Sequence, residues 1–263
     1  MTERASVETV AARAGALAAL HAGPRMLVLP NAWDAASAKV LEAAGFPAIA
    51  TTSGGVANAV GYEDHQGAPP AEMIAAAARI TRAVSIPVTV DFEAGYGMQP
   101  REVIERLIEA GAAGFNFEDT DHGGEAPLVD AGLQAERIAA LKAASHAAGV
   151  DLVLNARVDV FVHRQGTIEE QTAEGLRRAR VYRDAGADCV YPILQADEAI
   201  LSQFIAAVGP INVNLRPGGQ LTLQRAAAIG VRRVSYATSL FREAMSALER
   251  LAKEIEAETT ALS

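Results

Sequence analysis

Eight short runs of apolar residues recur along the chain and predict buried β-strands. Strands with so little polar interruption are typical of a parallel sheet that helices cover. The predicted strands are Met26–Pro30, Ala48–Thr52, Pro87–Asp91, Gly114–Glu118, Asp151–Ala156, Cys189–Pro192, Ile211–Asn214 and Arg233–Ser235.

The longer segments between these runs are rich in alanine and have the apolar spacing of helices. The predicted helices are Ala35–Ala44, Ala71–Val84, Pro100–Ala110, Leu133–Ala148, Ile168–Ala185, Glu198–Val208, Leu221–Ala228 and Leu240–Glu256, with a leading helix over Val7–Ala22. Four of the helix-to-strand junctions contain Ala-Gly, at Gly45, Gly111, Gly149 and Gly186. A glycine there provides the positive φ of a helix C′ position.

Eight strand–helix units in 263 residues match an α/β fold of the closed (β/α)8 or TIM barrel type, with an extra N-terminal helix. A doubly wound open sheet is the alternative. The chain has neither a G-x-G-x-x-G sequence nor a P-loop, which weakens that alternative. No Pro- or Ser-rich linker divides the sequence, so residues 1–263 are predicted to form one domain.

Polar side chains follow the predicted strands at their carboxyl ends, where the active sites of such barrels form. They are Asn31, Trp33 and Asp34; Thr51, Thr52, Ser53, Gly54 and Gly55, with Asp64 in the loop beyond; Asp91 and Glu93; Asn116, Glu118 and Asp119; Asn155, Arg157 and Asp159; and Asn212 and Asn214. We expect these side chains to surround one cavity.

Asp91 and Glu93 carry the clearest candidate chemistry. Two residues apart in a strand, their side chains project to the same face, and Glu118 ends the neighbouring strand. Carboxylates that converge repel one another unless a cation lies between them, and oxygen ligands favour Mg²⁺ or Mn²⁺. The sequence therefore predicts a metal site. The simpler alternative is that each carboxylate caps a helix or pairs with an arginine.

Arg157 lies at a strand end, where its planar guanidinium can bind a carboxylate or a phosphate. The alternative role is a salt bridge to Glu118 or Asp159. The turn predicted over Thr52–Gly55 offers hydroxyl and backbone N–H groups that could hold a carboxylate. The segment Arg216–Gly219 is interpreted as a plain turn, although barrel loops at that place often bind phosphate.

The histidines and the cysteine give weaker signals. His65, His122 and His163 fall in loops at the carboxyl ends of the strands, so each is a candidate for proton transfer. His122 lies in the long loop 119–130, which could close as a lid. Cys189 lies within an apolar strand and is expected to be buried and structural.

The composition excludes several other functions. The chain has 23 basic and 32 acidic residues, which argues against a nucleic-acid partner. One cysteine allows no intramolecular disulfide and no Cys-rich zinc site. Only Lys39, Lys142 and Lys253 could form a Schiff base, and all three lie in predicted helices. With no signal peptide and no apolar run near the roughly 20 residues of a membrane span, we expect a cytoplasmic protein with no membrane partner.

Five motifs, in order along residues 24–245, resemble those of the isocitrate lyase/phosphoenolpyruvate mutase superfamily. The motifs are Pro30–Ala38 with Ala44–Phe46, Val90–Gly97 as a variant of D-x-D-x-G-Y-G, Phe117–Asp119, Asn155–Asp159 and Ala185–Asp188. The resemblance implies a (β/α)8 barrel whose last helix is often exchanged between the subunits of a dimer or tetramer. It also implies Mg²⁺ that binds a 2-oxo acid and stabilises an enolate.

The same resemblance assigns roles by position. Asp91 would hold the metal, and Glu93, Glu118 and Asp64 would hold its waters. The resemblance further implies that Thr52 and the backbones of Ser53 and Gly54 bind the substrate carboxylate, that Arg157 and Asn214 contact the substrate, and that Trp33 supports the site.

The chain departs from that family in the loop after the fourth strand. The isocitrate and methylisocitrate lyases carry K-[KR]-C-G-H there, whereas residues 119–128 contain no cysteine. The lysine of the mutases falls near Gly124 and their histidine near Ile193. Without those cations a phosphoryl group in transfer would lack charge stabilisation, so the resemblance gives less support to P–C bond chemistry.

These inferences together predict a Mg²⁺-dependent lyase or decarboxylase, with Mn²⁺ as the other possible metal. It would cleave a C–C bond of a small 2-oxo or 2-hydroxy (di)carboxylic acid through an enolate. Asp64, Glu118 and Arg157 would take part in catalysis, and His122 or a water on the metal would supply the proton. The alternatives are a phosphonopyruvate mutase or hydrolase and a barrel that binds 2-oxo acids without turnover. The expected partners are a small carboxylate substrate and further copies in a homodimer or homotetramer.

Overall fold

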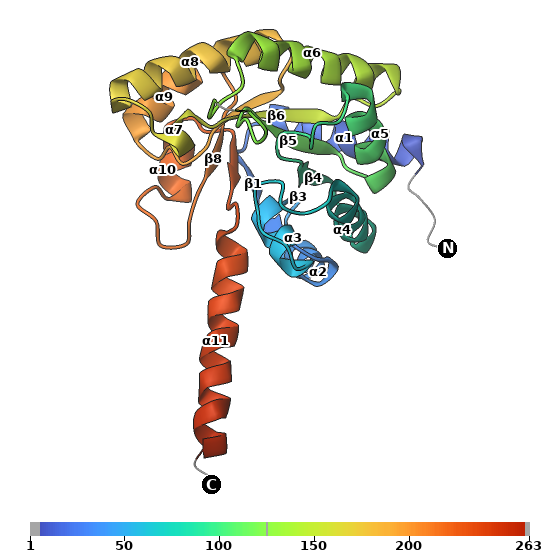
Figure 1. The fold of residues 1–263 in the computed structure, drawn as a ribbon, viewed down its shortest axis with the longest axis vertical. Helices are drawn as coiled ribbons and strands as arrows, with labels where there is room; N and C mark the ends of the chain where they lie inside the picture. The colour runs from blue at the N-terminus through green and yellow to red at the C-terminus, as the bar shows by residue number, and fades with distance from the viewer. Residues whose placement is uncertain (1–5, 125, 261–263) are drawn as a thin grey trace.

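Parallel strands form the centre of the molecule and helices surround them (Figure 1). The structure is a computed structural model that describes residues 6–124 and 126–260. The strands are β1 (Leu27–Leu29), β2 (Asn31–Ala32), β3 (Ile49–Thr51), β4 (Val88–Asp91), β5 (Gly114–Glu118), β6 (Val153–Val158), β7 (Cys189–Pro192), β8 (Asn212–Asn214) and β9 (Arg233–Ser235).

Two links join these strands into a closed ring. One sheet has the order β2-β3-β4-β5-β6-β7 and the other has the order β1-β9-β8. Val190 of β7 pairs in parallel with Ile211, the residue before β8. β1 and β2 are one run of chain separated only by Pro30, which has no N–H to donate to a ladder. The predicted barrel order is thus confirmed, and the single strand predicted over Met26–Pro30 is in fact divided at the proline.

All of the predicted helices are present, although the bounds of some differ from the predicted ones. The helices are α1 (Val7–Ala22), α2 (Ala35–Ala43), α3 (Ser53–Ala59), α4 (Pro70–Ala83), α5 (Pro100–Ala110), α6 (Ala131–Ala147), α7 (Val160–His163), α8 (Ile168–Asp184), α9 (Glu198–Val208), α10 (Leu223–Ala228) and α11 (Ser239–Thr260). The four junction glycines, Gly45, Gly111, Gly149 and Gly186, have φ of 88°, 80°, 74° and 103°, as predicted for C′ positions.

The short helix α3 corrects the turn predicted over Thr52–Gly55. Serine and two glycines are poor helix formers, so their sequence predicts no helix. The helix forms because the chain turns sharply at the end of β3, and the backbone N–H of Ser53 donates to Asp91 Oδ2 at 3.1 Å. Tertiary contacts override the local preference of the chain at this position.

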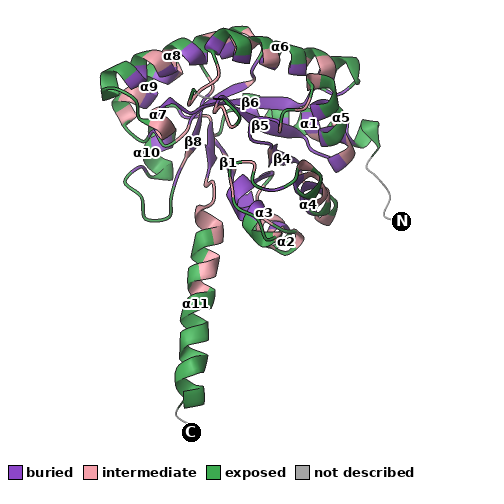
Figure 2. Ribbon diagram, in the orientation of Figure 1, coloured by how far each residue is buried: buried purple, intermediate pink, exposed green. Residues whose placement is uncertain are grey.

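The last helix, α11, leaves its own barrel and extends away from it (Figure 1). None of its described residues is buried (Figure 2). Leu248, Leu251 and Ile255 are 58%, 55% and 65% exposed. Their spacing places them on one face of the helix, so α11 carries an uncovered apolar stripe. Within the described residues, no helix combines the length and the apolar character needed to cross a membrane.

A buried histidine joins α1 to the inside of the barrel. The Nδ1 atom of His21 lies 2.9 Å from the carbonyl oxygen of Leu17, so Nδ1 carries the hydrogen. Its Nε2 can then accept from Arg233 Nη1 at 3.4 Å. Burial, and next the charge of Arg233, lower the pKa of His21 to about 4. The folded protein therefore holds this histidine neutral.

The free energy of unfolding should fall as the pH drops from 6.5 towards 4. Over this range the unfolded chain takes up a proton at His21, which has its ordinary pKa of 6.5 there, while the folded chain does not. The loss reaches about 3 kcal/mol at the acid end of the range. Urea unfolding at several pH values should show this slope in the wild type. It should be reduced in His21→Gln and retained in the exposed-site control His146→Gln; an equal slope in all three would contradict the assignment.

Candidate active site

A cavity of about 310 Å³ opens at the carboxyl ends of the barrel strands. Six residues that the sequence analysis assigned to a site line it: Thr52, Ser53, Asp64, Asp91, Arg157 and Asn214. They come from different strands and loops, up to 162 positions apart in the sequence (52 to 214). The cavity therefore lies where the barrel rule places active sites.

Asp91, the last residue of β4, is held in one orientation by two donors. Its Oδ2 accepts from the backbone N–H of Ser53 at 3.1 Å, and its Oδ1 accepts from Asn116 Nδ2 at 3.3 Å. A second amide fixes Asn116, because Asn155 Nδ2 donates to Asn116 Oδ1 at 2.8 Å. Each Asp91 oxygen keeps a further acceptor position, and the side chain borders the cavity.

Asp64 reaches the same cavity from the loop between α3 and α4. It packs against Gly54, where a Cβ atom would lie only 2.6 Å from Asp64 Oδ2. Its other oxygen, Oδ1, is buried and has no hydrogen-bond partner among the described residues. A buried carboxylate oxygen without a donor is costly unless a cation or a water occupies the space before it.

Glu93 lies two residues beyond β4, which ends at Asp91, and has a left-handed backbone, so the prediction that both carboxylates lie in one strand is wrong. Glu93 is 3% exposed. Tyr96 Oη donates to Oε1 at 2.5 Å, and the backbone N–H of Gln66 donates to Oε2 at 2.6 Å. Burial raises the pKa of Glu93 to about 7, and the nearby charges of Glu118 and Asp91 act in the same direction. Both of its oxygens thus have protein donors already, and each retains one free acceptor position.

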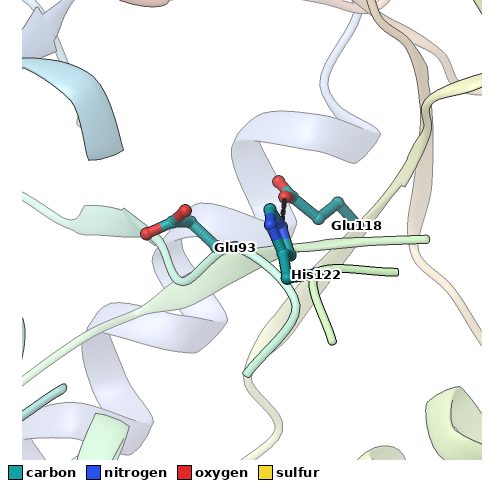
Figure 3. Close-up of side chains that lie close together, drawn as sticks. All are labelled: Glu93, Glu118 and His122. Carbon is teal, nitrogen blue, oxygen red and sulfur yellow. Dashed lines mark hydrogen bonds and ion pairs between the residues drawn. The ribbon is translucent and has the colours of Figure 1, made fainter. Parts of the chain in front are cut away.

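Glu118, at the end of β5, is hydrogen-bonded to His122 (Figure 3). The distance from His122 Nε2 to Glu118 Oε1 is 2.6 Å. Burial raises the pKa of Glu118 well above its usual range, and burial lowers the pKa of His122. Ligand atoms of Glu93, Glu118 and His122 all lie within 4.8 Å of one another, close enough to hold one metal ion.

Arg157, in β6, forms the salt bridge that the sequence analysis gave as its alternative role. Its Nε and Nη2 each donate to a different oxygen of Asp159 at 2.6 Å, and its Nη1 lies 2.7 Å from Glu118 Oε2. Both carboxylates are almost fully buried. Arg157 still borders the cavity, so it can pair with these carboxylates and face a ligand at the same time.

A second ion pair supports this network from behind. Asp119 Oδ1 accepts from the backbone N–H of Asp159 at 2.8 Å. Asp119 Oδ2 accepts from Arg178 Nη1 at 3.0 Å and from Tyr182 Oη at 2.7 Å. Burial raises the pKa of Asp119, although Tyr182 and Arg178 act to lower it. These contacts hold β6 and α8 in register with the end of β5.

His163, the third loop histidine, lies beside this network and does not line the cavity. Its Nε2 is 3.0 Å from Thr120 Oγ1, which in turn donates to Asp159 Oδ2 at 2.5 Å. His65 does line the cavity, and its ring centre lies 6.3 Å from that of His122. The structure therefore brings two of the three candidate histidines together.

Of the remaining predicted residues, Thr52 and Asn214 line the cavity and Trp33 does not. Thr52 Oγ1 lies 3.0 Å from Thr238 Oγ1 at its wall, and Asn214 Oδ1 accepts from the backbone N–H of Leu194 at 3.0 Å. The ring of Trp33 packs edge-on against the ring of Phe241, with 5.5 Å between the ring centres. This contact joins α11 to the start of α2.

Part of the cavity wall was missed by the sequence analysis. Tyr236, Thr238, Ser239 and Arg242 line it from the end of β9 and the start of α11. The same rule that selected Asp91 and Glu118 would have found the first three, since they directly follow a predicted strand. Arg216, interpreted as part of a plain turn, also borders the cavity.

The residues present fit a divalent metal ion. The cluster offers carboxylate oxygens, the ligands that Mg²⁺ and Mn²⁺ prefer, and a histidine nitrogen, which Mn²⁺ tolerates better than Mg²⁺. Asp64, whose buried Oδ1 has no hydrogen-bond partner among the described residues, is close enough for its charge to raise the pKa of Glu118. The donor set thus has the chemistry of a site for a hard cation.

The fold and the site define a (β/α)8 barrel with a cavity at the carboxyl ends of its strands, bordered by two carboxylates and three arginines. Comparison with known families makes the class more specific. The model of the phosphoenolpyruvate phosphomutase family matches residues 17–256, and the chain belongs to this family, within the isocitrate lyase/phosphoenolpyruvate mutase superfamily.

Three similar proteins illustrate the range of the family. An uncharacterised protein of Mycobacterium tuberculosis is 35% identical over 233 residues, which cover 87% of this chain and 86% of that protein. The 2-methylisocitrate lyase of Bacillus subtilis is 27% identical over 250 residues, which cover 90% of this chain and 80% of that protein. The crystal structure of 2,3-dimethylmalate lyase superposes with a TM-score of 0.80 at 27% identity. The match covers 93% of this chain and 86% of that lyase.

Proposed function

We propose that this protein is a Mg²⁺-dependent lyase or decarboxylase that cleaves a C–C bond of a small 2-oxo or 2-hydroxy (di)carboxylic acid. The observation that carries the proposal is a group of neighbouring carboxylates: Asp91 and Asp64, with its unpartnered oxygen, line the cavity beside Arg157. Glu93 and Glu118 cluster with His122 next to them, near enough for the charge of Asp91 to raise the pKa of both glutamates. Two of the similar proteins are named as lyases of small carboxylic acids, which supports the same class of reaction.

Asp91 would hold the metal directly, and Glu93, Glu118 and Asp64 would hold its water ligands. When bound, the ion supplies Lewis-acid polarisation of the 2-oxo group and stabilises the enolate left after C–C cleavage. Asp91 suits this role because Ser53 and Asn116 fix its orientation before any ligand arrives.

Arg157 and the cavity wall would orient the substrate. Arg157 has its guanidinium held rigidly by Asp159, so its remaining exposed face can bind a substrate oxygen at little cost in side-chain entropy. Thr52 and Asn214, with the backbone of Gly54, offer neutral hydrogen-bonding groups for the substrate carboxylate. The N–H of Ser53 serves Asp91 instead.

His122 is the side chain best placed to move a proton. Its Nε2 shares a hydrogen with Glu118 Oε1 across 2.6 Å, so either group can hold the proton between turnovers. The proton would be delivered to the carbanionic carbon of the product, which requires the loop 119–130 to bring His122 nearer the cavity than it lies here.

P–C bond chemistry has less support from the site. All three lysines of the chain lie away from the described residues that line the cavity, and Lys142 is paired with Asp151 and Asp188. A migrating phosphoryl group would therefore lack an ammonium partner, and the cations that border the cavity are the guanidinium groups of Arg157, Arg216 and Arg242.

The function can be tested by proton NMR in D₂O with pyruvate, oxaloacetate and 2-oxoglutarate. With Mg²⁺ present, the wild type should remove the C3 proton signal of at least one of these acids, and EDTA should prevent the loss. Phosphorus NMR with phosphonopyruvate provides the comparison. Conversion to phosphoenolpyruvate or phosphate, without any C3 exchange, would favour the mutase or hydrolase alternative. Metal-dependent binding with neither reaction would favour the non-catalytic barrel.

We also propose that residues 1–263 form one domain and that α11 packs against another copy of the chain in a homodimer or homotetramer. None of the described residues of its own subunit covers the apolar stripe of α11. Leu251→Glu should therefore reduce the oligomer to monomer in size-exclusion chromatography with light scattering. Lys253→Glu, also on the exposed part of α11, is the matched control and should leave the oligomer intact. A monomeric wild type would contradict this proposal.

A further inference from the structure

The loop between α3 and α4, residues 60–69, carries Asp64 and His65 to the cavity. Most of the loop is exposed, and Ala68 is its one buried residue. Residues 60–62 are hydrogen-bonded to α3, and beyond them few hydrogen bonds among the described residues hold the loop to the rest of the protein. At its start, the backbone N–H of Tyr62 donates to the carbonyl of Ala57 at 2.8 Å. Further along, the N–H of Gln66 donates to Glu93 Oε2 at 2.6 Å.

The loop backbone has an unfavourable conformation at the point where Glu93 binds it. His65 and Gln66 have φ of 62° and 59°, in the left-handed region that residues other than glycine rarely adopt. Two such residues in succession persist only where other contacts compensate for their cost. The charge-assisted bond from Gln66 to Glu93 is a contact of this kind, made at the strained residue itself.

Glu93 reaches the loop from a separate part of the chain, 27 positions away. Its own backbone is left-handed, with φ of 48°, and so is that of Tyr96, with φ of 54°. Tyr96 Oη fixes the other carboxylate oxygen at 2.5 Å. The tight turn after β4 is therefore shaped so that a buried carboxylate points at the Gln66 N–H. An aspartate at this position would be one methylene shorter.

We propose that Glu93 is a positioning residue that clamps the loop 60–69 over the cavity, whether or not the metal is bound. By holding the Gln66 N–H, Glu93 fixes the stretch of backbone that presents Asp64 and His65. The clamp rests on the proposed function only in that Asp64 would hold a water ligand of the metal. It gives Glu93 a second task beside that of holding water on the metal.

Hydrogen–deuterium exchange of the loop in EDTA separates these two tasks. A clamp that needs no metal predicts that Glu93→Gln speeds amide exchange at residues 62–67 by about tenfold or more in EDTA, since one charge-assisted bond is weakened. Glu93→Asp should do the same because its carboxylate falls short. A Glu93 that serves only the metal predicts no change in EDTA, and that result would overturn the proposal.

Three control variants keep the test specific. Asp64→Asn removes a metal-site carboxylate from the same loop and should leave exchange of the Gln66 N–H in EDTA unchanged. Glu63→Gln, at an exposed loop position, should also have no effect. Tyr96→Phe keeps the carboxylate but removes its second donor, so it should speed exchange by a smaller factor than Glu93→Gln. Faster exchange in Asp64→Asn to the same degree as in Glu93→Gln would show that any loss of acidic charge loosens the loop, and would overturn the clamp.

A second measurement connects the clamp with ligand binding. Isothermal titration with Mn²⁺, followed by oxalate as a planar dianion, should show weaker oxalate binding in Glu93→Gln than in Glu63→Gln. Exchange in EDTA does not depend on turnover. A wild type that fails to exchange C3 protons would therefore count against the proposed function and leave the clamp standing, whereas unchanged loop exchange would count against the clamp alone.

Discussion

Asp91→Ala should abolish metal-dependent C3 exchange and weaken the binding of Mn²⁺ by roughly a thousandfold or more, because it removes the proposed direct ligand. The loss should be large because the wild-type carboxylate needs no rearrangement to bind the ion. Ser53 and Asn116 already hold both of its oxygens in one orientation. Isothermal titration with Mn²⁺ and proton NMR in D₂O measure the two effects separately.

Two further variants make this result interpretable. Asp184→Ala removes an exposed carboxylate at the end of α8 and should change neither binding nor exchange. Asp91→Asn keeps the size of the side chain, but its amide would place a donor opposite the N–H of Ser53 or the amide of Asn116. It should also fail to bind the metal. If Asp91→Ala bound Mn²⁺ as tightly as the wild type, the ion would have to lie among Glu93, Glu118 and His122 instead.

The order of strands and helices could be predicted because it depends on local patterns. Apolar runs bounded by glycines locate the strands, and the left-handed glycines at Gly45, Gly111, Gly149 and Gly186 are where those patterns place them. Helix α3 could not be predicted in this way. Its first turn, Ser53 to Gly55, has low helix propensity, and its position depends on a contact with Asp91, 38 residues further along the chain.

The position of α11 relative to the barrel also could not be predicted from the sequence. The helix predicted after β9 is present, and Leu248, Leu251 and Ile255 form an apolar face on it that is exposed among the described residues. Periodicity identifies an apolar face but does not identify the surface that covers it. The proposal that this helix packs against another copy of the chain therefore rests on the family resemblance and on the uncovered stripe.

The candidate site could be predicted in outline from one rule about barrels. Side chains at the carboxyl ends of parallel strands meet, and Asp91 and Arg157 do meet at the cavity. The sequence did not reveal how Glu93 is used. Its contact with Gln66 joins a side chain to a backbone N–H in an irregular loop, and such a contact follows no sequence period. The two interpretations of Arg157 also proved compatible, since one guanidinium can pair with Asp159 and still border the cavity.

Arg157→Met should destabilise the folded protein by about 3–5 kcal/mol, because it leaves two buried carboxylates without their cation. Asp159 is fully buried and Glu118 is 1% exposed, and each lies within 2.7 Å of the guanidinium. Urea unfolding measures this loss. Arg177→Met breaks an exposed pair with Glu174 and should cost less than about 1 kcal/mol.

The double variant Arg157→Met/Asp159→Asn distinguishes charge from shape in this network. Removing the stranded charge of Asp159 should restore part of the stability lost in Arg157→Met, since the penalty comes from an uncompensated buried carboxylate rather than from a cavity. It should not restore C3 exchange, because the guanidinium proposed to bind the substrate oxygen, that of Arg157, would still be missing. Arg157→Lys should be intermediate in stability, as an ammonium cannot match both oxygens of Asp159 and also reach Glu118. A double variant no more stable than Arg157→Met would show that the packing of the arginine side chain, and not its charge, holds the ends of β5 and β6 together.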